Sequence, residues 1–539
     1  MVHRDRPTNI GLLYDWFAEA ARPTVMHLDR PFDIAPDAGT RFDGAGLADV
    51  VREASGWLYA AGLRHGDRLA IVKDNHYDML MLAAAAARIG ALPAVIAPLK
   101  SVETVRTMVA RVGPALVVAS PGMLARAAAA GSELAAPGVR TVVLGEPGNG
   151  AGPQAVTLAN LRGAEPPPPN PRRADEPMIV VHSSGTTGVP KLVVHSADTI
   201  GWAMSRMETI RWPVVESSTE DVVAISVAFA HGRIVSWTAG QFVLAPKSLV
   251  IISDHGLDNV ASMLAEHRPT SLEACPNIFQ RWEELAETRP ELFRDVRLFV
   301  GTFDAIHPRT VRKFLATSRR RIPVWGQAWG QSEVGPICIA AFTRRQVRRR
   351  PEPRGATNDI GWPVPILSRV KVVDPETGRK QPRGKPGILM VATKSRCLGY
   401  LGEEDRHAEK VRGKWWNTGD IGQRGRFGRL KLIDREVDLL PGASGVELES
   451  ILLDRLERAT EVVVLGVPGR PPVPVLCMRD DRLDPAEWAA ATADLPALDE
   501  PIVIPWEDVP RTATWKIRRL ELRELVLGTK DKIGTGRWT

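Results

Sequence analysis

Helix-like and strand-like segments alternate along the chain, and this alternation limits the folds that the chain can adopt. Residues 47–63 carry apolar side chains at helical spacing as far as Gly62, and 67–74 then has the pattern of a short buried strand. The same succession of helix and strand returns in 79–98, 102–120 and 311–327. Strands separated by helices pair in parallel, with the helices on the faces of the sheet. We therefore expect an α/β fold that binds its ligands at the carboxyl ends of the strands.

The chain is too long for a single hydrophobic core. With 539 residues it should form two or more packed units. In 370–392, turn signals separate short strands, which is typical of an antiparallel β-subdomain. A last compact segment combines a helical pattern at 448–459 with a following strand. We expect a large N-terminal domain over 1–434, with parallel-rich sheets, helices and the β-subdomain, and a small α+β C-terminal domain over 435–539.

The charge distribution bears on possible nucleic-acid binding. The net charge of +7 favours phosphate-bearing ligands only weakly, because arginines are scattered along the chain. Two arginine-rich runs, 318–322 and 343–355, concentrate positive charge. Aromatic residues do not interleave with them, and no helix-turn-helix, zinc-finger or RNA-binding pattern accompanies them. We therefore expect no nucleic-acid partner.

Several sequence features indicate where the protein resides. The N-terminal residues lack the apolar stretch of a secretory signal. The most apolar segment, 79–98, is interrupted by Arg88, Gly90 and Pro93, so it reads as a buried helix and strand rather than a membrane span. The spacing of the cysteines fits neither a metal site nor a disulfide framework: Cys275, Cys338, Cys397 and Cys477. We expect a cytoplasmic protein without a membrane span.

A loop rich in serine, threonine and glycine lies between two strand-like runs in 180–196, which reads VVHSSGTTGVPKLVVHS. The hydroxyl groups can donate hydrogen bonds, the glycines let the backbone approach a ligand, and successive N–H groups can form an anion-binding nest. Lys191 adds a full positive charge. The loop suits a polyphosphate, although it lacks Walker A spacing and precedes a strand instead of a helix. A flexible hairpin turn is the alternative that this stretch alone leaves open.

Further segments accompany this loop in a fixed order. They are SSGTTGVPK (183–191), AFAHG (228–232), WGQSE (329–333), WWNTGDIG (415–422), LKLIDR (430–435) and VPRTATWKIRR (509–519). Together they resemble the motifs of the adenylate-forming superfamily, which contains acyl-CoA synthetases, nonribosomal peptide adenylation domains and luciferases. The likeness covers nearly the whole chain.

The resemblance implies an ATP-dependent, AMP-forming enzyme that activates a carboxylate. A small carboxylic acid and ATP would give an acyl-adenylate and pyrophosphate, and rotation of a mobile lid, 435–539, would then allow transfer of the acyl group to an acceptor. Coenzyme A is the expected acceptor, which makes the chain an acid:CoA ligase. The alternative acceptors are an amine or nitrite, as in amide synthetases and ATP-dependent diazotases that resemble these ligases. A nonenzymatic nucleotide-binding relative is an alternative of another class, and the intact motifs argue against it.

The resemblance also assigns roles to individual residues. Lys516 resembles the mobile lysine that stabilises charge on the carboxylate and the α-phosphate, and His231 resembles the residue that lines the acid pocket. Glu333 resembles the carboxylate that holds Mg²⁺, with Thr186 as a second ligand. Nucleotide-binding roles are implied for Ser183, Ser184, Gly185, Thr186, Thr187, Gly188, Lys191, Gly301, Thr302, Phe303, Trp329, Gly330, Ser332, Asp420 and Arg435. His182 and His195 match no such role, and we expect them to be structural.

The chain departs from the family pattern at several places, among them Leu192, which follows Pro-Lys where the family usually has glycine. Phe303 and Asp304 replace a small Gly-Gly-Ala-Pro-like turn, and they predict a pocket for a small or aromatic acid, with Asp304 available to an amino or hydroxyl group. The loop after Arg435 is shorter than in the family, which argues against coenzyme A. Trp515 stands in place of a glycine beside Lys516, which predicts a stiffer lysine loop.

Overall fold

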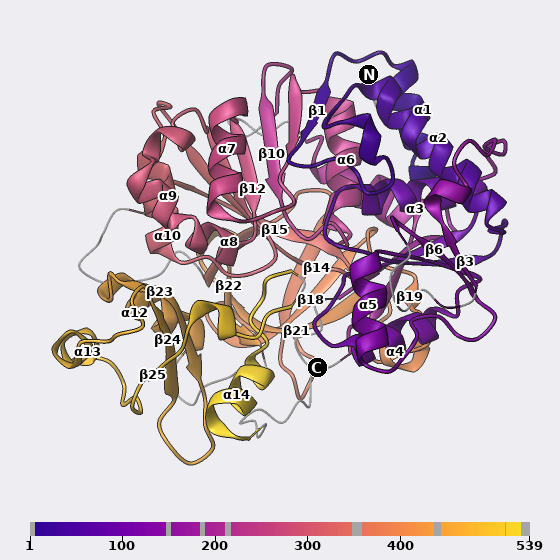
Figure 1. The fold of residues 1–539 in the computed structure, drawn as a ribbon. Coiled ribbons are helices and arrows are strands. Elements are labelled where there is room, and N and C mark those ends of the chain that lie inside the picture. Colours follow the sequence, from indigo (N-terminus) through magenta and orange to yellow (C-terminus); the bar gives the residue numbers. More distant parts are fainter. Residues whose placement is uncertain are drawn as a thin grey trace. The chain divides into compact units, whose positions relative to one another are not determined.

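The computed structural model describes residues 6–146, 152, 154–183, 189–210, 217–347, 358–435, 444–512 and 514–529. The chain folds into two compact units. Unit 1 consists of Met1–Pro269, Gln331–Gly335 and Lys394–Glu409. Unit 2 consists of Thr270–Gly330, Pro336–Thr393 and Lys410–Thr539. Figure 1 shows the elements of both units along the chain.

A mixed sheet forms the first layer of unit 1. Its strands follow the order β19, β9, β8, β4, β3, β5, β6, β7. Their bounds are β3 Arg68–Val72, β4 Leu92–Ile96, β5 Leu116–Ala119, β6 Arg140–Val143, β7 Ala155–Thr157, β8 Pro177–His182, β9 Leu192–Ser196 and β19 Gly399–Tyr400. The strands from β8 to β7 pair in parallel, whereas β9 pairs antiparallel with both β8 and β19. The parallel part confirms the α/β fold expected from the alternation of helix and strand.

Local sequence signals explain why the helices of this layer begin and end where they do. The helix α4, Val102–Val112, begins after Ser101, whose hydroxyl accepts from the Thr104 N–H, and ends at Gly113 in the left-handed conformation. The alanine-rich helix α3, Asp78–Ile89, is buried along its length, as expected for a core helix rather than a membrane span. The other helices around this layer are α2 Gly44–Ala60 and α5 Pro121–Ala129. Apolar residues of α4 and α5 pack with the inner strands in one core cluster.

A second group of strands in unit 1 follows the order β10, β11, β1, β2. Their bounds are β1 Val25–Leu28, β2 Arg41–Phe42, β10 Val222–Ser226 and β11 Ser248–Ile251. Further helices of unit 1 are α1 Ile10–Glu19, the π-helix η3 Ala197–Met204, α6 Arg233–Leu244, α7 Leu257–His267 and α11 Glu404–Lys410. Strand β10 leads directly into the segment that carries His231. The loop 227–232 therefore follows the carboxyl end of a strand, as the sequence pattern predicts.

Unit 2 contains a long run of strands in the order β17, β18, β21, β22, β16, β15, β14, β13, β12. Their bounds are β12 Ser271–Ala274, β13 Leu298–Gly301, β14 Val324–Gln331, β15 Gly335–Thr343, β16 Asp359–Pro363, β17 Ser368–Val373, β18 Pro386–Thr393, β20 Val411–Arg412, β21 Trp415–Arg424 and β22 Leu430–Arg435. Strands β12 to β14 are parallel, and β16 to β22 pair antiparallel. The predicted β-subdomain is therefore present. The helices are α8 Pro276–Arg281, α9 Glu283–Thr288 and α10 Pro308–Thr317, so the expected helix beginning at 311 ends before Arg319, Arg320 and Arg321.

The last part of unit 2 is a small α+β arrangement (Figure 1, orange to yellow). It consists of β23 Ala459–Leu465, β24 Val473–Met478 and β25 Ile502–Val503 with α12 Gly445–Arg455, α13 Pro485–Thr492 and α14 Arg519–Leu527. Leucines of α12 pack with valines of β23 in one apolar cluster. Arg309 of α10 donates to the carbonyls of Leu453 and Ala459 at 2.7 and 2.6 Å. The region after residue 444 thus has a core of its own and also contacts Thr270–Gly330.

Among the helices that the structure describes, none is both long and apolar enough to cross a membrane.

Candidate active site

The Ser/Thr/Gly loop connects two antiparallel strands at one end of the unit 1 sheet. His182, the last residue of β8, pairs with Leu192, the first of β9. The Ser183 N–H donates to the Lys191 carbonyl at 3.0 Å, and the Lys191 N–H donates to the Ser183 hydroxyl at 3.0 Å. These bonds close the base of the loop and fix where the Lys191 side chain begins. The five residues of the loop that were predicted to bind phosphate, Ser184, Gly185, Thr186, Thr187 and Gly188, lie outside the described residues.

Lys191 and Glu333, from motifs more than a hundred residues apart, lie close together in unit 1. Lys191 Nζ is 4.0 Å from Glu333 Oε1 and 5.2 Å from the centre of the Tyr400 ring. Tyr400, in β19, donates its hydroxyl hydrogen to Glu333 Oε1 at 2.6 Å. Burial and the Glu333 carboxylate raise the pKa of Tyr400 well above its ordinary value, so the hydroxyl stays a donor.

The surroundings of Glu333 fit a metal ligand. A carboxylate is the kind of oxygen ligand that Mg²⁺ prefers, and Mg²⁺ is commonly held by one or two carboxylates together with substrate phosphates. Among the described residues, the polar contacts of this side chain fall on Oε1, which leaves Oε2 for a cation. The backbone is fixed as well, because the Cys397 N–H donates to the Glu333 carbonyl at 2.7 Å. Glu333 therefore suits the Mg²⁺ role, whereas Thr186 lies outside the described residues.

Two histidines hold Ser332, the residue before Glu333. His231 Nδ1 accepts from the Arg233 N–H at 3.0 Å, so its Nε2 carries the hydrogen that faces the Ser332 hydroxyl at 3.0 Å. His195 Nε2 faces the Ser332 carbonyl at 2.8 Å and must therefore be the protonated nitrogen. Burial lowers the pKa of His195 to about 4, which keeps its imidazole neutral. These contacts give His195 a definite structural task beside the site, in keeping with its expected structural role.

His182 is fixed in a similar way at the base of the loop. Its Nε2 accepts from the Ala97 N–H at 3.1 Å, so Nδ1 carries the hydrogen and faces the Ser183 carbonyl at 2.8 Å. Burial lowers the pKa of His182, consistent with a neutral ring. This contact joins the end of β8 to the end of β4, and it positions the first residue of the loop.

In unit 2, Asp420 and Arg435 lie opposite each other on neighbouring strands. The register of β21 and β22 pairs the two residues directly. Asp420 is buried, and its N–H donates to the Thr418 hydroxyl at 3.1 Å. A buried carboxylate on a sheet can act as a bidentate acceptor for two ribose hydroxyls. Trp329 and Gly330 lie at the end of β14 in the same unit.

The segment after β13 has an unusual backbone. Gly301 ends the strand, and the Thr302 hydroxyl donates to Glu273 Oε1 at 3.2 Å. Phe303 has a φ of +84°, a left-handed conformation that residues other than glycine rarely adopt. Asp304 is exposed, and its Oδ1 accepts from the Ala305 N–H at 3.0 Å. The residues that replace the small turn of the family therefore occupy a constrained, surface-facing turn.

Lys516 lies in a turn closed by Thr512. The Thr512 N–H donates to the Lys516 carbonyl at 2.8 Å, and the Lys516 N–H donates to the Thr512 hydroxyl at 3.1 Å. Trp515 has a φ of +63°, the conformation that explains why a glycine would be expected there. Its ring stacks on Trp506 with 5.7 Å between the centroids. The guanidinium of Arg511 lies 4.2 Å from the Trp506 centroid on the same turn.

Within unit 1 the structure brings together Lys191, His231, Ser332 and Glu333 of the predicted site residues. Unit 2 holds Gly301, Thr302, Phe303, Asp304, Trp329, Gly330, Asp420, Arg435 and Lys516. Tyr400 was missed, although its bond to Glu333 is among the shortest in the site. A tyrosine within a Gly-Tyr-Leu segment gives no sign of its partner, because that partner is 67 positions away in the chain.

Comparisons with known proteins agree with this geometry. A family model described as AMP-binding enzyme matches residues 20–401. The chain is 37% identical over 552 aligned positions to 3-amino-2-hydroxy-4-methoxybenzoate diazotase of Streptomyces cremeus, which covers 98% of this chain and 97% of that protein. It is 23% identical to 4-coumarate–CoA ligase 5 of Oryza sativa subsp. japonica, over 77% of this chain and 75% of the ligase. The crystal structure of the anthranilate CoA ligase AuaEII in complex with anthranoyl-AMP has the same fold, with a TM-score of 0.79 at 18% identity, covering 97% of this chain and 99% of that one.

The chain belongs to the AMP-binding enzyme family. The resemblance carried by the six motifs is thereby confirmed, and so is an adenylating enzyme as the general class.

Proposed function

We propose that this protein is an ATP-dependent diazotase that acts on an amino-substituted aromatic acid with nitrite as the second substrate. The observation that carries this proposal is the 37% identity to a diazotase along 98% of the chain, against 23% along 77% for a CoA ligase. The activity of a relative is a stronger guide when the similarity extends over nearly the whole of both proteins, as it does here. An acceptor other than coenzyme A, which was the alternative in the sequence analysis, thus becomes the first candidate.

The reaction balances without a further oxidant or reductant. An oxygen of nitrite attacks the α-phosphorus of ATP, the bond to the β-phosphate oxygen breaks, and pyrophosphate leaves. The aromatic amine then attacks the nitrogen of the activated nitrite, AMP leaves, and the amine loses a proton. The remaining N–H proton of the resulting nitrosamine then moves to its oxygen, and loss of hydroxide from the N=N–OH group gives the diazonium ion. The net products are the diazonium ion, AMP, pyrophosphate and water.

The residues of the site support the first of these steps. Lys191, at the base of the loop, carries the positive charge that suits the phosphates that leave. Mg²⁺ held by Glu333 would offset the phosphate charge, and Tyr400 would orient that carboxylate. Asp420 would hold the ribose, and Arg435 would contact the nucleotide. Lys516 would stabilise charge at the α-phosphate when 435–539 acts as a lid after the N-terminal domain, 1–434.

Other residues are assigned to substrate recognition. His231 presents a fixed Nε2–H near Ser332 and would meet the oxyanion. Asp304, in the exposed turn after β13, would pair with the amino group of the aromatic substrate. Phe303 would supply an aromatic face. The remaining nucleotide contacts would come from the loop 183–188 and from Gly301, Thr302, Trp329, Gly330 and Ser332.

An acid:CoA ligase is the second candidate. It is favoured by the similarity to 4-coumarate–CoA ligase 5 and by the shape shared with anthranilate CoA ligase. In that case the aromatic carboxylate would be adenylated, and coenzyme A would be the acceptor. The shorter loop after Arg435, on which the sequence argument against coenzyme A rests, lies largely outside the described residues.

Oxygen labelling distinguishes the two candidates. The purified protein would be given ATP, Mg²⁺ and an aminohydroxybenzoic acid, with nitrite labelled with ¹⁸O and ¹⁵N, or with coenzyme A. A diazotase transfers ¹⁸O from nitrite to AMP and ¹⁵N to the aromatic product. A CoA ligase instead transfers carboxylate oxygen to AMP and forms a thioester without nitrite. Release of AMP with coenzyme A alone would contradict the proposal.

A further inference from the structure

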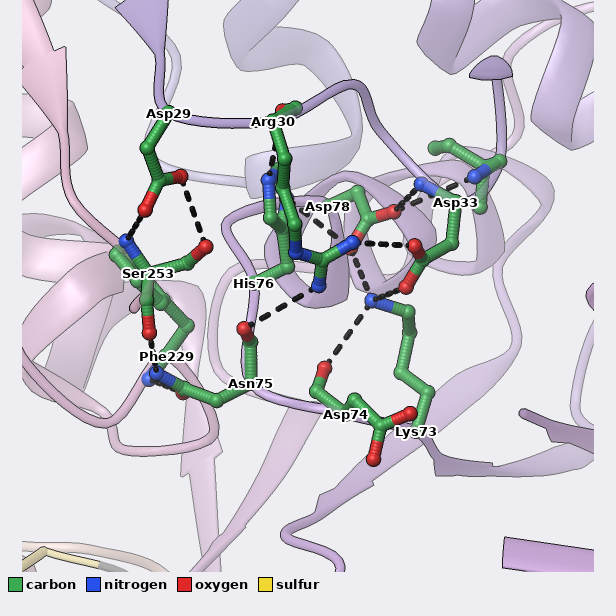
Figure 2. A network of polar contacts seen from close by, with 11 residues as sticks. Asp29, Arg30, Asp33, Lys73, Asp74, Asn75, His76, Asp78, Phe229 and Ser253 are labelled. Atoms are coloured by element: carbon green, nitrogen blue, oxygen red, sulfur yellow. Dashed lines mark hydrogen bonds and ion pairs between the residues drawn. The ribbon is translucent and has the colours of Figure 1, made fainter. Parts of the chain in front are cut away.

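A network of charged and polar side chains lies in unit 1, apart from the residues assigned to the nucleotide (Figure 2). Its centre is Lys73, whose side chain is fully buried. Lys73 Nζ lies 2.5 Å from Asp78 Oδ1 and 2.7 Å from Asp33 Oδ2. Both charges of a buried ion pair lose water, so such a pair is weak evidence for stability, and we interpret this one as fixing a particular arrangement of the chain.

The ion pairs fix the turn between β3 and α3. Lys73 follows the last residue of β3, and Asp78 is the first residue of α3. Asp78 Oδ2 also accepts from the Asp33 N–H at 2.8 Å and from the Ile34 N–H at 3.3 Å. A salt bridge across both ends of a short connection leaves the residues between them little freedom. Asn75 lies within this connection.

Asn75 holds the backbone of the loop that follows β10. Its Oδ1 accepts from the Phe229 N–H at 2.8 Å (Figure 2). Its Nδ2 donates to the Val227 carbonyl at 3.1 Å. Nδ2 also lies 3.5 Å from the Ser253 carbonyl. The side-chain amide thus uses both its acceptor and its donor on one short stretch of backbone. Two such contacts set the orientation of the loop as well as its position.

The stretch held by Asn75 ends at the histidine of the site. His231 is two residues beyond Phe229, and its N–H donates to the Ala228 carbonyl at 3.1 Å. The ring faces the Ser332 hydroxyl at 3.0 Å, and Ser332 precedes Glu333. An unbroken series of contacts therefore leads from the buried Lys73 to the proposed oxyanion-binding group.

We propose that Asn75 is a positioning residue that acts through His231. It holds the loop 227–232 so that the His231 Nε2–H points at the oxyanion that is to be adenylated, and the Lys73–Asp78 pair holds Asn75. The role of His231 on which this inference rests is that of the proposed function. A displaced catalytic group about 1 Å from its place can lower a rate by about a hundredfold.

The experiment measures ATP–pyrophosphate exchange with nitrite, and with an aromatic acid if nitrite gives none. The Asn75→Ala variant should lower kcat/KM for the oxyanion by about tenfold or more, while KM for ATP stays within about twofold. Asn75→Asp keeps the acceptor for the Phe229 N–H but places a carboxylate oxygen against the Val227 and Ser253 carbonyls, so it should lower kcat/KM at least as much as Asn75→Ala. This second variant retains the side-chain volume if the first does not fold.

Asn259→Ala is the matched control. The Asn259 amide is also half-buried and donates to Asp29 Oδ2 at 3.0 Å and to the Asp254 carbonyl at 2.9 Å. Asp29 accepts hydrogen bonds from Ser253, so Asn259 lies in the same part of unit 1 as Asn75. The control removes two hydrogen bonds of a side-chain amide that has no described contact with 227–229. Asn259→Ala should leave kcat/KM for the oxyanion within about twofold of the value of the original protein.

If Asn75 acts through His231, a second result is expected that a merely structural role of Asn75 would not produce. In a His231→Ala background, Asn75→Ala should change kcat/KM by less than about twofold, because the group that it positions is absent. Equal losses in the two backgrounds would overturn the inference, as would equal effects on the oxyanion and on ATP. Exchange with an aromatic acid but not with nitrite would reject the diazotase and still allow the test of Asn75.

Discussion

Two substitutions of Trp515, the tryptophan beside Lys516, should differ in stability in the direction opposite to the usual one for glycine and alanine. In most positions, alanine stabilises a protein more than glycine by about 0.4–1 kcal/mol, because glycine gives the unfolded chain more freedom. Trp515 has a φ of +63°, where any side chain with a Cβ is strained. Trp515→Gly should therefore leave the protein more stable than Trp515→Ala.

The structure provides the magnitudes. Both variants lose the stack on Trp506, whose centroid lies 5.7 Å away, and such a pair contributes about 0.5–1.5 kcal/mol beyond its buried area. Only the glycine variant also loses the strain, which is about 1–2 kcal/mol for a left-handed residue. After the greater freedom of the unfolded glycine chain is subtracted, the glycine variant should be the more stable by about 1 kcal/mol.

The assay is urea unfolding followed by far-ultraviolet circular dichroism, with the midpoints compared at equal slope. Trp506→Ala is the companion variant, because it removes the stack and leaves Trp515 in its strained conformation. It should be at least as destabilised as Trp515→Ala, because it also removes the ring that the guanidinium groups of Arg281 and Arg511 contact. If Trp515→Ala proved as stable as Trp515→Gly or more so, the left-handed backbone would not be the reason for the strain, and the explanation would be wrong.

Three further predictions concern the buried pair, the tyrosine and the lysine. Lys73→Met should destabilise the protein by about 3–5 kcal/mol in urea unfolding, since Asp78 stays buried without its cation, and adding Asp78→Asn should restore part of the loss. Burial raises the pKa of Asp78, but the charge of Lys73 outweighs it and holds that pKa below its ordinary value. The stability that the pair contributes is therefore fully present above about pH 4 and is lost as the pH falls further. Acid unfolding of the original protein and of Lys73→Met would measure this loss. Tyr400→Phe should raise the Mg²⁺ concentration for half-maximal pyrophosphate exchange by about tenfold, because Glu333 loses the group that orients it, and an unchanged requirement would contradict that role. Lys516→Ala should abolish exchange while ATP binding, measured by calorimetry, persists, and retained exchange would remove the lysine from the proposed mechanism.

The sequence predicted the parallel part of the fold because its evidence is local. Helical spacing and β-branched runs gave α3, α4 and the strands beside them, and Gly62 marked the end of a helix that the structure ends at Ala60. The hairpin of β17 and β18 followed from turn residues in the same way. Each of these signals lies within a few positions of the element that it predicts.

The candidate site was predicted less completely, because its contacts join residues that are distant in the chain. Lys191 and Glu333 were found separately through their motifs, but nothing in either motif states that their side chains lie 4.0 Å apart. Asn75 bonds to Val227 and Phe229, 152 and 154 positions away, and Tyr400 bonds to Glu333, 67 positions away. A polar residue of this kind reads as ordinary until the fold brings its partner beside it.

The burial of the cysteines determines how the native chain meets electrophiles. Cys275, Cys338, Cys397 and Cys477 are all buried. Burial raises the pKa of Cys338, Cys397 and Cys477 well above its ordinary value, so few of these side chains are thiolates at neutral pH. Alkylating and nitrosating agents attack the accessible thiolate. Thiol modification of this protein is therefore expected to require local or global opening of the fold, and the rate of labelling would measure that opening.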